Sequence, residues 1–191
     1  MSVMAIRRQN RKIPDALIGV GLLIFSEVMF FAGLVSAYFI SRATLGAWPP
    51  LGQIRLPVLL TGVNTIIFLG SGYYAWQARR TYLSGHFQKS GRILTASLGL
   101  GGLFLILQGS EWVRLIGFGL DAKASVYGAF FYLIIGAHGC HVVAGLLALL
   151  MSRRIVGARS HAGSDKFYAI VLFWEFVVLL WPLLYLIVYV I

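Results

Sequence analysis

Five ionisable side chains lie within or near the ends of long apolar stretches, and they are the residues whose chemistry needs an explanation. Glu27, His138, His141 and Glu175 are well inside these stretches, and Glu111 is nearer an end. A charged acid at the centre of a bilayer costs about 2.5 kcal/mol or more, so such groups are usually functional or paired. With a rise of about 1.5 Å per residue, Glu27, His141 and Glu175 fall at a similar depth in the inner half of a membrane. These three side chains are therefore candidates to meet.

The two histidines, His138 and His141, are three residues apart and so share one helical face. With Glu27 or Glu175 they would form a two-histidine, one-carboxylate metal site. Alternatively, each histidine forms hydrogen bonds across the helix bundle and has a structural role. Because an isolated histidine pair at this spacing is a weak metal signal, the structural interpretation is favoured. We predict neither a metal site nor a catalytic residue in this chain.

The two acids Glu27 and Glu111 have different surroundings. Glu27 lies in Phe-Ser-Glu-Val-Met-Phe-Phe, an apolar setting that favours the neutral form of a carboxyl group. Such an acid is either a proton relay or a hydrogen-bonded residue that holds two helices together, and the sequence leaves both interpretations open. Glu111 precedes Arg114 by three residues, which predicts a structural ion pair on one helix.

The elements that carry these residues are predicted to be membrane-spanning helices. Apolar residues make up 59% of the 191 positions and charged residues only 12%, about half the charged share of a soluble domain. A span requires about 20 apolar residues. We therefore predict an all-α, polytopic membrane protein whose single transmembrane domain covers residues 1–191 and has five spans, at about 17–40, 56–78, 93–113, 125–151 and 167–191.

The distribution of basic residues predicts the orientation of the bundle. Most of the 16 Lys and Arg residues lie before the first span, between spans two and three, or between spans four and five. Basic loops are usually cytoplasmic, so the amino terminus is expected in the cytoplasm and the carboxyl terminus on the opposite side. The formal charge of +10 does not indicate nucleic-acid binding, because the basic residues form no continuous face.

Several segments, taken in order, resemble subunit III of the haem-copper terminal oxidases, the cytochrome c and quinol oxidases of aerobic respiration. A lone Gly-x-His-Gly would mean little, whereas local matches in the family's order along nearly the whole chain are specific. The matching segments are residues 26–39, the loop residues Trp48, Pro49 and Pro50, and residues 64–65, 107–112, 126–128 and 136–142.

This resemblance implies an accessory subunit that contacts core subunit I and subunit II in a bacterial cytoplasmic membrane. It implies that haem and copper belong to the core, and that this chain holds no cofactor other than phospholipid in a cleft between helices. Glu27 would be the family's carbodiimide-reactive acid. The family's subunit is thought to stabilise the core during turnover and to support proton uptake, and Trp48, Pro49 and Pro50 would lie at a loop or interface.

The fifth predicted span departs from the family pattern. The family usually has Trp-His-Phe-Val-Asp, where this chain has Glu175 in place of the histidine and Val178 in place of the aspartate. A role for that histidine and aspartate therefore does not transfer, and the change suggests a divergent bacterial branch. Our hypothesis is that Glu175 pairs with a histidine of the fourth span.

Other functions fit part of the pattern. A nitric oxide reductase accessory protein of the same family is one alternative, and a small proton-coupled transporter using Glu27 and Glu175 is another. The transporter interpretation is weakened because the spans show no internal repeat. A metal-dependent membrane enzyme built on His138 and His141 lacks a recognisable nucleophile. The sequence does not distinguish cytochrome c from quinol as electron donor.

Overall fold

Five long helices make up nearly all of the described chain, which in this computed structural model comprises residues 14–45, 56–120, 122–123 and 125–191. These residues contain no β-strand, and all five helices are long and apolar enough to cross a membrane. The predicted all-α fold with five spans is confirmed. The helices are α1 (Asp15–Leu45), α2 (Val58–Leu83), α3 (Phe87–Gly117), α4 (Val126–Gly157) and α5 (Ser164–Tyr185), with a short 3-10 helix (His161–Gly163) before α5 and a π-helical turn (Leu186–Val190) after it.

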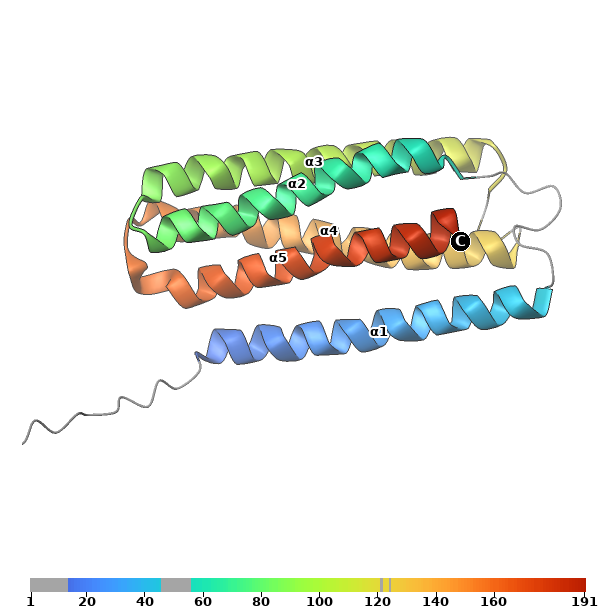
Figure 1. Cartoon of the computed structure of the whole chain (residues 1–191), viewed down its shortest axis with the longest axis horizontal. Helices are drawn as coiled ribbons and strands as arrows, with labels where there is room; N and C mark the ends of the chain where they lie inside the picture. The colour runs from blue at the N-terminus through green and yellow to red at the C-terminus, as the bar shows by residue number, and fades with distance from the viewer. Residues whose placement is uncertain (1–13, 46–55, 121, 124) are drawn as a thin grey trace, which may run out of the picture.

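Successive helices run in opposite directions, so α1, α3 and α5 all begin at the end of the bundle where α2 connects to α3 (Figure 1). Helices α2, α3, α4 and α5 form the packed body, whereas α1 lies along one side against α5 and α4 (Figure 1). Of the α1 side chains that the structure describes, the buried hydrophobic ones are Val20, Phe31 and Tyr38. Helix α1 is therefore the most weakly packed of the five.

The helices extend beyond the predicted spans, and the connections are shorter than the span boundaries indicate. Helix α2 continues to Leu83 and α3 already begins at Phe87, so residues 84–86 are the entire connection. Hydropathy locates the stretch that fits the hydrocarbon layer, but backbone hydrogen bonds continue the helix into the polar interface. Arg79 and Lys89 consequently lie inside helices and not in loops.

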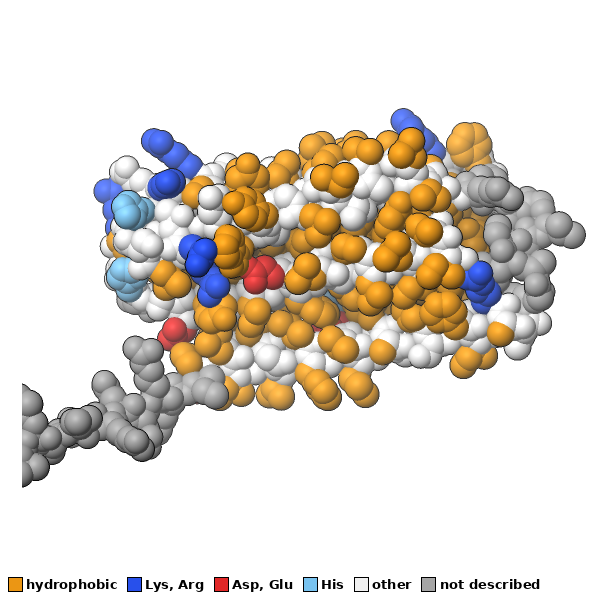
Figure 2. Space-filling view, viewed as in Figure 1, with side chains coloured by type: hydrophobic (Ala, Val, Ile, Leu, Met, Phe, Trp, Pro, Cys, Tyr) orange, Lys and Arg blue, Asp and Glu red, His pale blue; other side chains and the backbone are white. Residues whose placement is uncertain are grey.

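Small and hydroxyl-bearing residues allow close packing in the body of the bundle. The side-chain hydroxyls of Ser71 and Ser97 each donate to the other residue's carbonyl at 2.8 Å, which joins α2 to α3. A Cβ atom at Gly145 would lie 2.6 Å from Cε3 of Trp174, and one at Gly101 would lie 2.8 Å from its Cζ2. Packing of this kind stabilises helix bundles in membranes. The outer surface is largely hydrophobic along its length, with basic side chains near both ends (Figure 2).

Candidate functional site within the membrane

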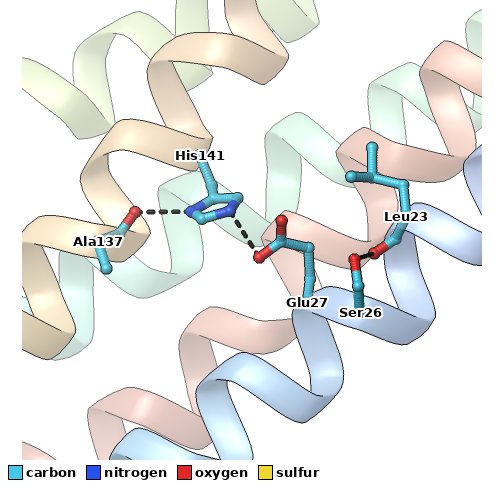
Figure 3. Close-up of polar contacts among 5 residues, drawn as sticks. All are labelled: Leu23, Ser26, Glu27, Ala137 and His141. Atoms are coloured by element: carbon cyan, nitrogen blue, oxygen red, sulfur yellow. Dashed lines mark hydrogen bonds and ion pairs between the residues drawn. The ribbon is translucent and has the colours of Figure 1, made fainter.

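A carboxyl group of α1 meets an imidazole of α4 inside the apolar part of the bundle. Oε2 of Glu27 lies 2.8 Å from Nε2 of His141, and the two side chains are 18% and 20% exposed (Figure 3). The other ring nitrogen of His141, Nδ1, lies 2.7 Å from the carbonyl oxygen of Ala137, one turn earlier on α4. Both nitrogens of His141 are therefore engaged, one within its own helix and one across to α1.

These two contacts determine how many protons the pair of Glu27 and His141 holds. A carbonyl oxygen only accepts, so the contact with Ala137 places a proton on Nδ1 of His141. The short contact with Glu27 then requires one more proton, carried either by Nε2 or by the carboxyl group. The pair is a neutral imidazole with a carboxylic acid, or an imidazolium with a carboxylate. Its net charge is zero in both forms, which reduces the cost of placing it in a membrane.

His138 points in a different direction from His141, although the two residues are only three apart. Its ring is 1% exposed and stacks on Trp181 of α5, with 5.0 Å between ring centroids and 28° between planes. Phe31 and Phe68 lie edge-on to it. Neither of its nitrogens has a hydrogen-bond partner among the described residues. His138 is thus part of the aromatic core and does not join the pair of Glu27 and His141.

The hypothesis that Glu175 pairs with a histidine of the fourth span is wrong. The contact of His141 is made by Glu27, and that of His138 by the ring of Trp181. Trp174 occupies the inward-facing position of α5, so Glu175, one residue further along the helix, is turned towards the outer face. There it borders a groove beside α1 and a smaller one beside α2.

The predicted ion pair between Glu111 and Arg114 is also wrong. Glu111 is 3% exposed and faces α2, where its Oε2 accepts a hydrogen bond of 2.9 Å from the hydroxyl of Thr61. Arg114 is exposed on another side of α3. The spacing of three residues permits contact, but the burial of Glu111 separates it from Arg114.

Glu111 belongs to a polar cluster that the sequence did not single out. Nε2 of Gln108 donates to the hydroxyl of Tyr189 at 2.9 Å, and Nδ2 of Asn64 donates to Oε1 of Gln108 at 3.3 Å. Close by, the indole nitrogen of Trp181 donates to the hydroxyl of Thr65 at 2.9 Å. One feature of the sequence could have indicated this cluster. Asn64 and Gln108 carry amide side chains inside apolar runs, where polar side chains need partners.

A metal-dependent site finds no support in the described part of the chain. Those residues contain no group of three or more His, Cys, Asp or Glu side chains placed to hold a metal ion. Within the two-histidine, one-carboxylate set considered above, only Glu27 and His141 are in contact. Trp48, Pro49 and Pro50, predicted at a loop or interface, lie outside the described residues.

An apolar groove of about 800 Å³ runs along the junction of α1 and α5. Its α1 wall includes Ile24, Val28 and Val35, and its α5 wall includes Leu179 and Leu183. Glu175 is the ionisable residue on its lining. The groove reflects the weak packing of α1, since a side chain from a neighbouring helix would otherwise fill this space.

The fold and the pair of Glu27 and His141 define a class: multi-pass helical membrane proteins in which a carboxyl–histidine contact joins two spans. The family model for cytochrome c oxidase subunit III matches residues 10–191. The chain therefore belongs to the cytochrome c oxidase subunit III family, which makes it an accessory subunit of a haem-copper oxidase and part of an oxidase complex. The resemblance found in the sequence is confirmed.

Individual relatives agree with the family match. The chain is 32% identical to the probable cytochrome c oxidase subunit 3 of Mycobacterium leprae over 182 residues, which cover 91% of this chain and 87% of the relative. It is 34% identical to the subunit 3 of a Synechocystis species, covering 92% and 76%. The subunit 3 of Corynebacterium diphtheriae is 32% identical, covering 98% and 91%.

Proposed function

We propose that this chain is the non-catalytic subunit III of an oxygen-reducing terminal oxidase in a bacterial cytoplasmic membrane. It binds core subunit I and subunit II, and haem and copper are held by these partners. Its amino terminus is cytoplasmic and its carboxyl terminus lies on the opposite side. This orientation is supported by the basic residues near the α2–α3 and α4–α5 connections, since such residues favour the cytoplasmic side.

The observation that carries the proposal is the contact between Glu27 and His141. It holds one exchangeable proton, and it ties the weakly packed α1 to α4. Because α1 has few other buried contacts, loss of this contact would readily release α1 from the bundle. Loss of one contact in the packed body would leave its helix held by the remaining contacts. The pair thereby stabilises the oxidase core during turnover and supports proton uptake from the cytoplasmic side.

The groove between α1 and α5 is the proposed site of bound phospholipid. Its lining is almost wholly apolar and its volume of about 800 Å³ accommodates acyl chains. A lipid in this position would fill the space between the two helices and so support α1 on the side away from α4.

The test is purification of the tagged full chain in mild detergent, followed by visible spectroscopy, mass spectrometry and assays of oxygen and nitric oxide reduction. The proposal predicts copurification of a large haem-containing subunit, oxygen reduction by the complex, and no haem on this chain after the complex is dissociated. A colourless homo-oligomer that transports protons would contradict it. A complex that reduces nitric oxide and not oxygen would assign the chain to the nitric oxide reductase branch.

A further inference from the structure

We propose that a basic groove between the start of α3 and the end of α4 binds the phosphate headgroup of an anionic phospholipid. The basic groove is defined by Lys89 and Arg92 on α3, Arg153 on α4 and Arg159 just after α4. It is separate from the groove between α1 and α5. The proposal concerns this chain alone, and it holds or fails independently of the proposed oxidase function.

The geometry of the basic groove is that of a shallow headgroup site. Two adjoining hollows of about 560 and 430 Å³ share Phe87, Gln88, Arg92 and Arg159 as lining residues. They open at the end of the bundle that carries the α2–α3 and α4–α5 connections, where basic side chains gather (Figure 2). This end is where a bilayer places its phosphate groups, just beyond the hydrocarbon layer.

The charges in the basic groove lack a counter-charge within the described residues. No carboxylate there lies within 4.0 Å of Lys89, Arg92, Arg153 or Arg159, since the contact between Glu27 and His141 is the only such pair in the described ranges. Among the residues that the structure describes, no acidic one lines either hollow. The two adjoining hollows bring four cations onto one surface, where they repel one another, and a phosphate bound there would reduce that repulsion. Lysine and arginine are also the side chains that proteins use to hold phosphate.

The backbone presents Arg159 in a fixed but unusual conformation. Its φ of 50° lies in the left-handed region, which a side chain disfavours and which glycine normally occupies after a helix. The adjoining residue is anchored, because the hydroxyl of Tyr82 donates to the carbonyl of Ser160 at 2.5 Å. Glycine would serve the turn better than arginine does. An arginine in this strained position is explained if its side chain binds a ligand.

The surface of α3 beyond the basic groove favours a lipid over a free anion. Gly91 and Thr95 line one hollow, and Gly99 and Gly102 continue the same helical face towards the middle of the bundle. A Cβ atom at Gly99 or Gly102 would meet nothing within 4 Å. This open strip leaves space for an acyl chain to extend from the headgroup into the hydrocarbon layer.

The experiment compares lipid retention by the full chain and its variants, using native mass spectrometry after equilibration with an equimolar mixture of phosphatidylglycerol and phosphatidylcholine. The test variant combines Arg92→Gln, Arg153→Gln and Arg159→Gly, the last of which removes backbone strain together with the charge. The matched control is Arg114→Gln, an exposed arginine at the opposite end of α3.

We expect the wild-type chain and the Arg114→Gln control to prefer phosphatidylglycerol. The triple variant should lose about 100-fold in that preference, since each cation near an anionic lipid is worth about 1 kcal/mol. Equal retention of phosphatidylglycerol by the triple variant and the control would overturn the proposal. Displacement of the bound lipid by millimolar inorganic phosphate would overturn the lipid assignment and identify a site for free phosphate.

Discussion

Two acids within the spans, Glu111 and Glu27, have very different surroundings in this bundle. Glu111 is 3% exposed in the packed body, with a hydrogen bond from Thr61 and with Gln108 and Tyr189 beside it. Glu27 is on the weakly packed α1, and its partner among the described residues is His141. The difference indicates that the first acid is a fixed part of the core. The second joins α1 to α4 and depends on how α1 packs.

The largest expected effect is on the free energy of unfolding, which should fall far more for a truncation in the packed body than for one on α1. Trp174→Ala should lower the free energy of unfolding by about 3–5 kcal/mol, because its ring fills the space above Gly101 and Gly145. Phe25→Ala, an aromatic truncation at a 67% exposed position of α1, should change it by less than about 0.5 kcal/mol. Unfolding of the full chain in mixed micelles, with increasing denaturing detergent, measures both values. Similar losses for the two variants would contradict the distinction between body and edge.

A smaller effect tests whether Glu111 depends on its partners. Thr61→Val removes the donor to Oε2 of Glu111 and leaves a buried acceptor unsatisfied, which should cost about 1–3 kcal/mol in the same unfolding assay. Thr44→Val is the matched control, because the hydroxyl of Thr44 is exposed and contacts only carbonyls of its own helix. An unchanged free energy of unfolding for Thr61→Val would show that the polar cluster does not stabilise the core.

The next effect is smaller still and concerns Glu175. Because Glu175 contacts neither histidine, Glu175→Gln should change the free energy of unfolding by no more than about 0.5 kcal/mol. The lifetime of the oxidase during turnover should also stay close to that of the wild type. His141→Gln, measured alongside, should shorten that lifetime. Equal shortening by both substitutions would restore the hypothesis that Glu175 is the partner of a histidine.

Much of the fold is predictable because it depends on quantities that a sequence states directly. The length and apolarity of each stretch predict five spans, and the rise per residue places Glu27 and His141 at one level. The ends of the helices are less predictable, because helical hydrogen bonds continue past the hydrocarbon layer. The connection at residues 84–86 is short for this reason.

The direction in which a side chain points, into the bundle or outwards, is not predictable from residue spacing alone. Glu175 is turned outwards because Trp174 fits against two glycines of neighbouring helices, a contact between residues far apart in the sequence. His138 is turned inwards because Trp181 offers a ring to stack on. Both orientations result from packing between helices, which the pattern of one helix does not contain.

If Glu27 and His141 act as one unit, a double-substitution cycle on the purified oxidase should reveal their coupling. The measured quantity is the lifetime of oxygen reduction during continuous turnover, for Glu27→Gln, His141→Gln and the combined variant. We expect each single substitution to shorten the lifetime and the second to add no further loss, because either one already breaks the same contact. Losses that combine additively would contradict it.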